Sequence, residues 1–309
     1  MSPPHAGVVA DLLGRVQRAA LRRLATVGRR RPASRSAAPA PPDLSCAVRR
    51  VLVTGAGGRV ATLVLPWLRR DGLELACVDR RGVGGVPATG AVQRADLRSA
   101  AAADRLVRGH DAIVHLAAVA TEACVEDLLP DNVLALSHLL EAAARHGAGR
   151  FVFASSMHVV GMYDRDQPVD ESSPPRPDSH YAASKVHGEA LCRLYAERHA
   201  MAVTCLRLGS VTATLEEAEP ANWIGPQDVA QMVEIALRRE RPGLEIFHAV
   251  ADYEGSPLPA SRAAAFGYRC RQPAEPWAVA LARVARTWRD DPVARRKRGA
   301  TFASGRTGG

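Results

Sequence analysis

The chain has 309 residues, of which 47% are hydrophobic and 24% are charged, a composition typical of a globular protein rather than a disordered one. The net charge of +9 suggests nucleic acid or membrane until it is mapped along the chain. Residues 1–50 hold ten arginines and two aspartates, and residues 283–309 hold eight basic and two acidic side chains. The body over 51–282 is therefore slightly acidic, so we expect a small-molecule substrate, no nucleic-acid partner and no stable membrane association.

Six cysteines lie far apart and form no C-x-x-C pair. They indicate buried free thiols in a reducing compartment, so we expect a cytoplasmic protein. The Cys and His residues do not show metal-ligand spacing, and no metal is expected. No apolar run reaches the roughly 18 residues that suggest a membrane span.

Residues 1–48 are expected to be separate from the globular part. Apolar residues recur every three or four positions over 13–27 with arginines between them, which predicts a basic amphipathic helix, and an Ala/Pro/Ser-rich linker runs to Pro42. The alternatives are a disordered or non-native extension, a contact with anionic membrane, and a targeting or partner segment.

A glycine-rich turn between a strand and a helix is the first functional signal. Residues 50–53 form a short apolar strand, T-G-A-G-G-R-V-A follows over 54–61, and a helix is predicted to Arg70. Such a turn brings backbone N–H groups close to a pyrophosphate at the helix N-terminus. The residues predicted to bind this group are Gly55, Gly57, Gly58, Arg59 and Val60.

The second predicted strand, over 73–78, ends on Asp79. An acid 21 residues beyond Gly58 at a strand tip is placed to bond a ribose 2′-hydroxyl, and it would repel a 2′-phosphate. The pattern therefore favours NAD, although Arg80 and Arg81 follow directly and could accept the extra phosphate of NADP.

The strand–helix alternation continues. A short strand at 91–94 leads to Asp96 and Leu97, which we expect near the adenine, with a helix N-cap as the alternative role of Asp96. The strand over 111–118 ends in Leu116-Ala117-Ala118, where small residues let the backbone lie against the nicotinamide ribose.

The segment over 122–146 is helical and bent or broken at Pro130. Just beyond that proline, Asn132 carries an amide that could bond a distorted backbone beside the cofactor. The next strand, over 151–154, leads into Ser155-Ser156-Met157-His158. This order predicts an α/β fold with a doubly wound parallel (Rossmann) sheet over 49–282 and a site at the carboxyl ends of its strands.

Tyr181 and Lys185 lie four residues apart in a segment without proline, so they share one face of a predicted helix over 180–199. An ammonium group beside a phenol lowers the pKa of the tyrosine toward working pH. A tyrosine tuned in this way can move a proton to or from a hydroxyl or carbonyl group.

Three motifs now stand in order: T-G-A-G-G-R-V-A, A-S-S-M-H, and Y-A-A-S-K beginning 25 residues after Ser156. Together they resemble the short-chain dehydrogenase/reductase superfamily in its extended, epimerase/dehydratase-like branch. Within that branch, residues 50–282 look like NAD-dependent uronate dehydrogenases. The resemblance implies that Tyr181 is the general acid/base, that Lys185 lowers its pKa and holds the nicotinamide ribose, and that Ser156 bonds the reacting oxygen.

Departures from the uronate dehydrogenase pattern limit what the resemblance implies about the substrate. Met157 stands where those enzymes have asparagine, and Ala120 replaces a serine. Residues 210–223 lack the arginine that would hold a sugar carboxylate, and they carry three glutamates instead. The predicted substrate-binding residues are Ala120, Ser156, Met157, His158 and Ser210, with a structural role as the alternative for His158.

The rest of the chain is expected to form a small substrate-binding portion, from insertions at about 156–180 and 209–282. Asp228 is expected as the N-cap or first-turn acid of a helix over 226–239. Residues 283–309 are expected to be a basic, solvated or disordered tail.

The leading hypothesis is an NAD-dependent oxidoreductase that transfers hydride between nicotinamide and a hydroxyl or carbonyl of a sugar-like substrate. The alternatives are an NAD-dependent nucleotide-sugar epimerase with the same catalytic residues, and a dinucleotide-sensing protein without turnover. About 70 residues separate Gly209 from the tail, which is short for a domain that grips a nucleotide diphosphate. A homodimer is expected by analogy with extended family members.

Overall fold

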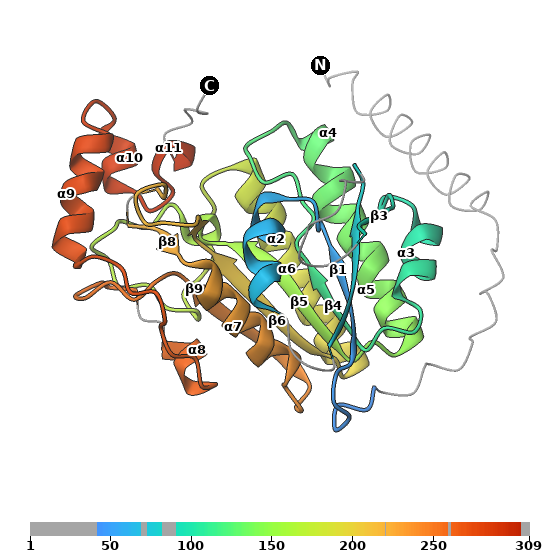
Figure 1. The fold of residues 1–309 in the computed structure, drawn as a ribbon. Helices are drawn as coiled ribbons and strands as arrows, with labels where there is room; N and C mark the ends of the chain where they lie inside the picture. Colours follow the sequence, from blue (N-terminus) through green and yellow to red (C-terminus); the bar gives the residue numbers. More distant parts are fainter. Residues whose placement is uncertain (1–41, 69–72, 82–90, 220, 259–260, 304–309) are drawn as a thin grey trace, which may run out of the picture. The chain divides into compact units, whose positions relative to one another are not determined.

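The computed structural model describes residues 42–68, 73–81, 91–219, 221–258 and 261–303 (Figure 1). The predicted amphipathic helix and the predicted helix end at Arg70 lie outside the described residues. Residues 42–48, expected to belong to the N-terminal extension, instead contact the globular part. Leu44 is buried, and its carbonyl accepts a hydrogen bond from Arg150 Nη2 at 2.6 Å. The folded part therefore begins before the predicted boundary at residue 49.

Seven parallel strands form the central sheet, in the order β3-β2-β1-β4-β5-β6-β9. The chain builds outward from β1 to β3 and then continues on the other side of β1 from β4 to β9, which confirms the doubly wound fold. The strands are β1 (Arg50–Thr54), β2 (Glu74–Asp79), β3 (Gln93–Arg94), β4 (Ala112–His115), β5 (Arg150–Ser156), β6 (Ala202–Leu208) and β9 (Gly243–Ala249).

Helices cover both faces of this sheet (Figure 1). One face packs against α2 (Arg59–Val64), the 3₁₀ turn Leu65–Trp67, α7 (Pro226–Leu237) and α8 (Ser261–Ala265). The other face packs against α3 (Ala100–Val107), α5 (Ala135–His146) and α6 (His180–His199). Successive residues of one strand point to opposite faces, so Val152 joins the first apolar core, while Phe151 and Phe153 join the second. Burial on both faces explains why these strands read as continuous apolar runs.

The predicted break at Pro130 is confirmed. Helix α4 (Val125–Leu128) runs into a π-helical turn over Leu129–Leu134, which continues as α5. Proline stands at the start of this turn, where its missing N–H group leaves an intrahelical bond unmade. Asn132 lies in the turn and is buried.

A small two-stranded sheet and three further helices follow. Strands β7 (Ser210–Val211) and β8 (Trp223–Ile224) pair with each other, and α9 (Trp277–Thr287), α10 (Pro292–Arg296) and α11 (Ala300–Ala303) gather at one end of the folded part (Figure 1). An apolar cluster joins Trp277 and Val284 of α9 to Trp223 and Tyr253.

The prediction of a solvated or disordered tail from residue 283 is therefore wrong for 283–303. Asp164 forms ion pairs with Arg296 at 2.8 Å and with Lys297 at 2.5 Å. The guanidinium group of Arg298 is buried and donates to the carbonyl of Gln167 at 2.5 Å. The basic side chains suggested solvation, but their partners belong to a segment about 130 residues earlier in the sequence.

No helix in the described part of the chain combines the length and the apolar character needed to cross a membrane.

Candidate active site

Ser156, Tyr181 and Lys185 meet at the carboxyl edge of the sheet. Ser156 ends β5, and the other two lie in the first turns of α6. Helix α6 begins where predicted because Ser179 caps it, its Oγ accepting from the Ala182 N–H at 3.0 Å. The Ser156 hydroxyl lies close enough to the Tyr181 phenol to lower its pKa, and it accepts a hydrogen bond from the His158 N–H at 3.2 Å. The structure therefore brings the three predicted catalytic residues together.

Lys185 is buried beside the phenol of Tyr181. Its Nζ donates to the Ala154 carbonyl at 2.8 Å and lies 5.7 Å from the centre of the Tyr181 ring and 4.9 Å from that of Phe153. Burial lowers the pKa of Lys185 to about 8.

The pKa of Tyr181 departs from the expectation. Burial raises it to about 12, the hydrogen bond with Ser156 opposes this rise, and the charge of Asp178 adds to it. The predicted lowering by Lys185 is therefore not found. Removing the phenol from water disfavours the phenolate more strongly than the nearby groups favour it.

A buried ion pair lies beneath this trio. Glu189, one helical turn after Lys185, accepts from Arg207 of β6 through two bonds of 2.9 Å. The same carboxylate accepts from Ser155 Oγ at 2.6 Å. The network ties α6 to β5 and β6 and so fixes Tyr181 and Lys185 above the strand ends. Sequence reasoning missed it, although an arginine within an apolar strand is a usable signal.

Asn132 joins the end of β4 to α6. Its Oδ1 accepts from the Val119 N–H at 2.8 Å, and its Nδ2 donates to the Val119 carbonyl at 3.1 Å and to Ser184 Oγ at 2.9 Å. Ser184 Oγ in turn donates to the carbonyl of Tyr181 at 2.6 Å. The amide bonds irregular backbone, as expected. These bonds fix the Asn132 side chain between the end of β4 and α6, and its binding to the cofactor stays a prediction.

His158 and Asp178 form a partly buried pair beside Tyr181. His158 Nδ1 lies 2.8 Å from Asp178 Oδ2. Burial alone lowers the pKa of His158, but the hydrogen bond and charge of Asp178, with a contribution from Glu219, outweigh it and raise the pKa. The ring of His158 also meets that of Tyr181 edge-on at 6.1 Å, so the imidazole lies next to the catalytic phenol.

The other predicted substrate residues are arranged less closely around the phenol. Ala120 is exposed after β4. Met157 is buried in an apolar cluster with Val160 and Tyr163, where its side chain supports the loop after β5. Ser210 opens β7, and its Oγ accepts from the Glu219 N–H at 3.4 Å, which ties it to the acidic loop.

The glycine turn forms a tight cradle beside this group. Gly55 has φ of +71°, and a Cβ atom there would lie 2.5 Å from the Ala117 backbone nitrogen. The turn and the backbone over 116–118 are therefore in direct contact, as a dinucleotide cradle requires. The Gly57 N–H donates to Asp79 Oδ2 at 3.1 Å, so the predicted ribose acid stands at the same turn.

The arginines after Asp79 are partly engaged elsewhere. Arg80 Nη1 forms an ion pair with Asp131 at 2.7 Å, which reduces its availability for a 2′-phosphate. The Arg81 N–H donates to Asp79 Oδ1 at 2.9 Å and holds the carboxylate in place. These contacts favour NAD over NADP.

Asp96 does not cap a helix, so that alternative is wrong. Ser99 is the N-cap of α3, and its Oγ accepts from the Ala102 N–H at 3.3 Å. Asp96 pairs with Arg98 at 2.6 Å near the surface, which leaves the adenine contact as its predicted role. Leu97 is buried, and its carbonyl lies 3.1 Å from His138 Nδ1.

Asp228 is the first-turn acid of α7, as one of the two expectations had it. It is fully buried and accepts from the N–H groups of Arg271 and Gln272 at 2.8 and 2.9 Å. Its role is structural, because it fastens a later loop to the helix.

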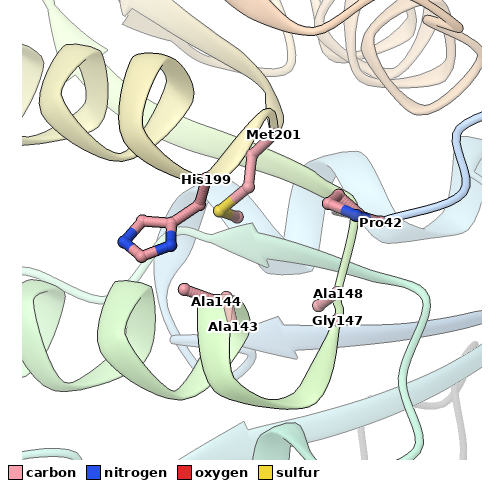
Figure 2. A pocket seen from close by; sticks show the side chains of 7 residues that line it. All are labelled: Pro42, Ala143, Ala144, Gly147, Ala148, His199 and Met201. Atoms are coloured by element: carbon pink, nitrogen blue, oxygen red, sulfur yellow. The ribbon is translucent and has the colours of Figure 1, made fainter. Parts of the chain in front are cut away.

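A small cavity lies away from this site (Figure 2). Its lining comes from the end of α5 and the turn before β5, from the end of α6 and the turn before β6, and from Pro42, at the amino edge of the sheet. Its central free space of about 10 Å³ has room for roughly one water molecule. The lining residues are Pro42, Ala143, Ala144, Gly147, Ala148, His199 and Met201. Within the described ranges, His, Cys, Asp and Glu form no group that could hold a metal ion.

A doubly wound sheet with a glycine cradle, an acid at the tip of β2 and a Ser-Tyr-Lys group at the carboxyl edge defines a dinucleotide-binding protein. Residues 51–243 match the NAD dependent epimerase/dehydratase family. The chain belongs to this family, as its three motifs suggested, and the family is NAD-dependent.

Individual relatives agree with this assignment. The uronate dehydrogenase of Pseudomonas putida is 32% identical over 247 residues, which cover 79% of this chain and 91% of that one. The L-arabinose 1-dehydrogenase (NAD(P)(+)) of Haloferax volcanii is 33% identical, covering 62% of this chain and 84% of that one. A mutant uronate dehydrogenase from Agrobacterium tumefaciens, solved in complex with NAD, superposes with a TM-score of 0.72 at 27% identity, covering 84% of this chain and 98% of that one. The resemblance to uronate dehydrogenases is confirmed.

Proposed function

We propose that this protein is an NAD-dependent oxidoreductase that oxidises a hydroxyl group of a free sugar to a carbonyl, or catalyses the reverse reduction. The observation that carries the proposal is that Ser156, Tyr181 and Lys185 meet at the carboxyl edge of the sheet, with the buried ammonium of Lys185 5.7 Å from the centre of the Tyr181 ring. The Gly55 cradle and Asp79 lie at the same edge of the sheet and fit a dinucleotide. Curated relatives include dehydrogenases of uronates and of L-arabinose.

The contacts of Ser156, Tyr181 and Lys185 indicate the role of each residue in the reaction. Oxidation of a carbinol removes a hydride from carbon and a proton from oxygen, and bound NAD supplies the hydride acceptor. Ser156 orients the hydroxyl oxygen by hydrogen bonding. Tyr181, as phenolate, accepts the hydroxyl proton, and in the reverse direction the phenol returns it. Lys185 stabilises the phenolate by its charge.

We infer further that neutral aldoses are better substrates than uronates. Residues 210–223 contain glutamates and neither lysine nor arginine. The charge of Glu219 reaches both His158 and Arg165. Asp178 already balances the positive charge of His158. A sugar carboxylate bound here would be repelled by these glutamates. Residues 210–223 also offer it no arginine with which to form a bidentate ion pair.

The test is a side-by-side assay of neutral aldoses and uronates with NAD and the full chain, following NADH by its absorbance. We expect NADH to accumulate, with higher kcat/KM for at least one neutral aldose than for any uronate. Bound NAD without NADH release against the whole panel would contradict the proposal and would leave epimerisation or cofactor sensing. Faster oxidation of uronates would overturn only the inference about charge. A homodimer stays a prediction, which the mass in solution tests.

A further inference from the structure

The short helix α11 places an aromatic ring against two residues of the site. The ring of Phe302 stacks on His158, with centroids 4.3 Å apart and an interplanar angle of 21°. It also meets the ring of Tyr181 edge-on, at 6.2 Å and 90°. Because His158 and Tyr181 contact each other as well, the three rings form one corner beside the catalytic phenol. Phe302 lies in the segment that the sequence suggested was solvated.

Several contacts fix this segment to the loop after β5. Asp164 pairs with Arg296 and Lys297, and the backbones of 164 and 297 form an antiparallel bridge. The Gly299 N–H donates to the Gly161 carbonyl at 2.9 Å. Phe302 follows this point of attachment by three residues, so its position depends on the docking of the whole segment.

Asp178 connects this docking to the site. A Cβ atom on either Gly161 or Gly299 would overlap Asp178 Oδ2. The carboxylate therefore fits between the loop and the C-terminal segment only because both positions are glycine. The same Oδ2 lies 2.8 Å from His158 Nδ1, so one group holds the imidazole and lies against the segment that carries Phe302.

We propose that Phe302 is a specificity-determining residue, whose ring, held against His158, forms an apolar wall against which the C–H face of the sugar packs while its hydroxyl lies at Tyr181. This inference rests on the proposed function and adds a contact to it. A pyranose or furanose ring has an apolar C–H face that gains contact with an aromatic ring, whereas the cofactor cradle lies with the glycine turn. Loss of the ring should therefore weaken sugar binding and leave cofactor binding intact.

The test compares Phe302→Ala and Phe302→Leu with Val293→Ala, an exposed apolar position on α10 of the same segment. For a sugar that the wild-type chain oxidises, we expect KM to rise roughly threefold to tenfold in Phe302→Ala, less in Phe302→Leu and not in the control. We expect kcat to change by less than about twofold, and the Kd for NADH, measured by fluorescence, to stay unchanged.

Asp164→Asn provides an independent route, because it weakens the docking and retains the ring. It should raise KM in the same direction as Phe302→Ala. An unchanged KM in Phe302→Ala overturns the inference. If this variant loses NADH affinity and thermal stability together while its KM does not rise, Phe302 has a purely structural role and the inference is overturned as well. If Phe302→Ala does not fold, Phe302→Leu decides by the same criteria. If the wild-type chain oxidises no sugar, both the proposed function and this inference are overturned. If the wild type is active and the Phe302 variants have the same KM as the wild type, this inference alone is overturned.

Discussion

Replacing Lys185 by methionine should abolish most activity and at the same time stabilise the fold. Burial lowers the pKa of Lys185 from 10.5 to about 8. A shift of this size corresponds to about 3 kcal/mol of unfavourable free energy for the charged folded form. Methionine loses the hydrogen bond to the Ala154 carbonyl, which contributes about 1 kcal/mol. The net expectation is a gain of about 2 kcal/mol in the free energy of unfolding at pH 7.

The stability gain of Lys185→Met should depend on pH, in a direction set by the lowered pKa of Lys185. Between pH 8 and 10.5 the unfolded chain holds a proton on Lys185 that the folded chain has lost, so wild-type stability rises with pH in that window. Below pH 8 Lys185 is charged in both states, and its full unfavourable contribution to folding stability is present. The advantage of Lys185→Met should therefore be full at pH 7 and should vanish as the pH approaches 10.5.

Urea unfolding followed by circular dichroism, at pH 7 and near 10, measures both effects. The control is Lys297→Met, which removes the chain's other lysine, at an ion pair with Asp164, and should not stabilise the protein. Equal or lower stability of Lys185→Met than of the wild type at pH 7, or a gain that persists near pH 10, would show that the buried charge of Lys185 does not destabilise the fold.

Three further predictions concern the sheet, acid stability and cofactor choice. Arg207→Met leaves the buried Glu189 carboxylate unpaired and should reduce the free energy of unfolding by about 3–5 kcal/mol, while the double variant with Glu189→Gln recovers much of the loss; equal urea midpoints would contradict this. Burial lowers the pKa of His115 and of His248 from 6.5 to about 3, so stability should fall as pH drops below 6.5, by about 2 kcal/mol per histidine at pH 5; a flat profile there argues against it. Asp79→Asn should narrow the preference for NAD over NADP by roughly tenfold in kcat/KM, and an unchanged ratio would remove Asp79 from cofactor selection.

The sheet and the meeting of Ser156, Tyr181 and Lys185 could be predicted because their signals are local. Strands buried on both faces give short apolar runs, and the tight turn at Gly55 needs glycine where its neighbour strand approaches. Tyr181 and Lys185 are four residues apart, so helix geometry alone places them together. Ser156 could be placed at the same edge because it ends a parallel strand, and the carboxyl ends of parallel strands share one edge of the sheet.

The C-terminal segment could not be predicted because its partners are distant in sequence. Arginine-rich composition is the same whether the cations are solvated or paired, and the Asp164 partner of Arg296 and Lys297 lies 132 and 133 residues away. The contact of Phe302 with the catalytic tyrosine follows from that docking and has no local signal.

The electrostatics of Tyr181 were misjudged for a related reason. Helical spacing showed a neighbouring cation but not the extent of burial, and burial raises the pKa of the phenol to about 12. The sequence gives no sign of the role of Glu189, because its partners Arg207 and Ser155 are brought close only by the tertiary fold.

The most direct test of the account is the rate of NADH formation from NAD and an accepted sugar by Tyr181→Phe. Tyr195→Phe is the matched control on the same helix, since its hydroxyl bonds Glu141 on the partly exposed side of α6. We expect Tyr181→Phe to bind NADH normally but to lose at least about 100-fold in kcat, while Tyr195→Phe remains as active as the wild type. A Tyr181→Phe chain that still oxidises sugar at the wild-type rate would contradict the assignment of the proton transfer to this tyrosine.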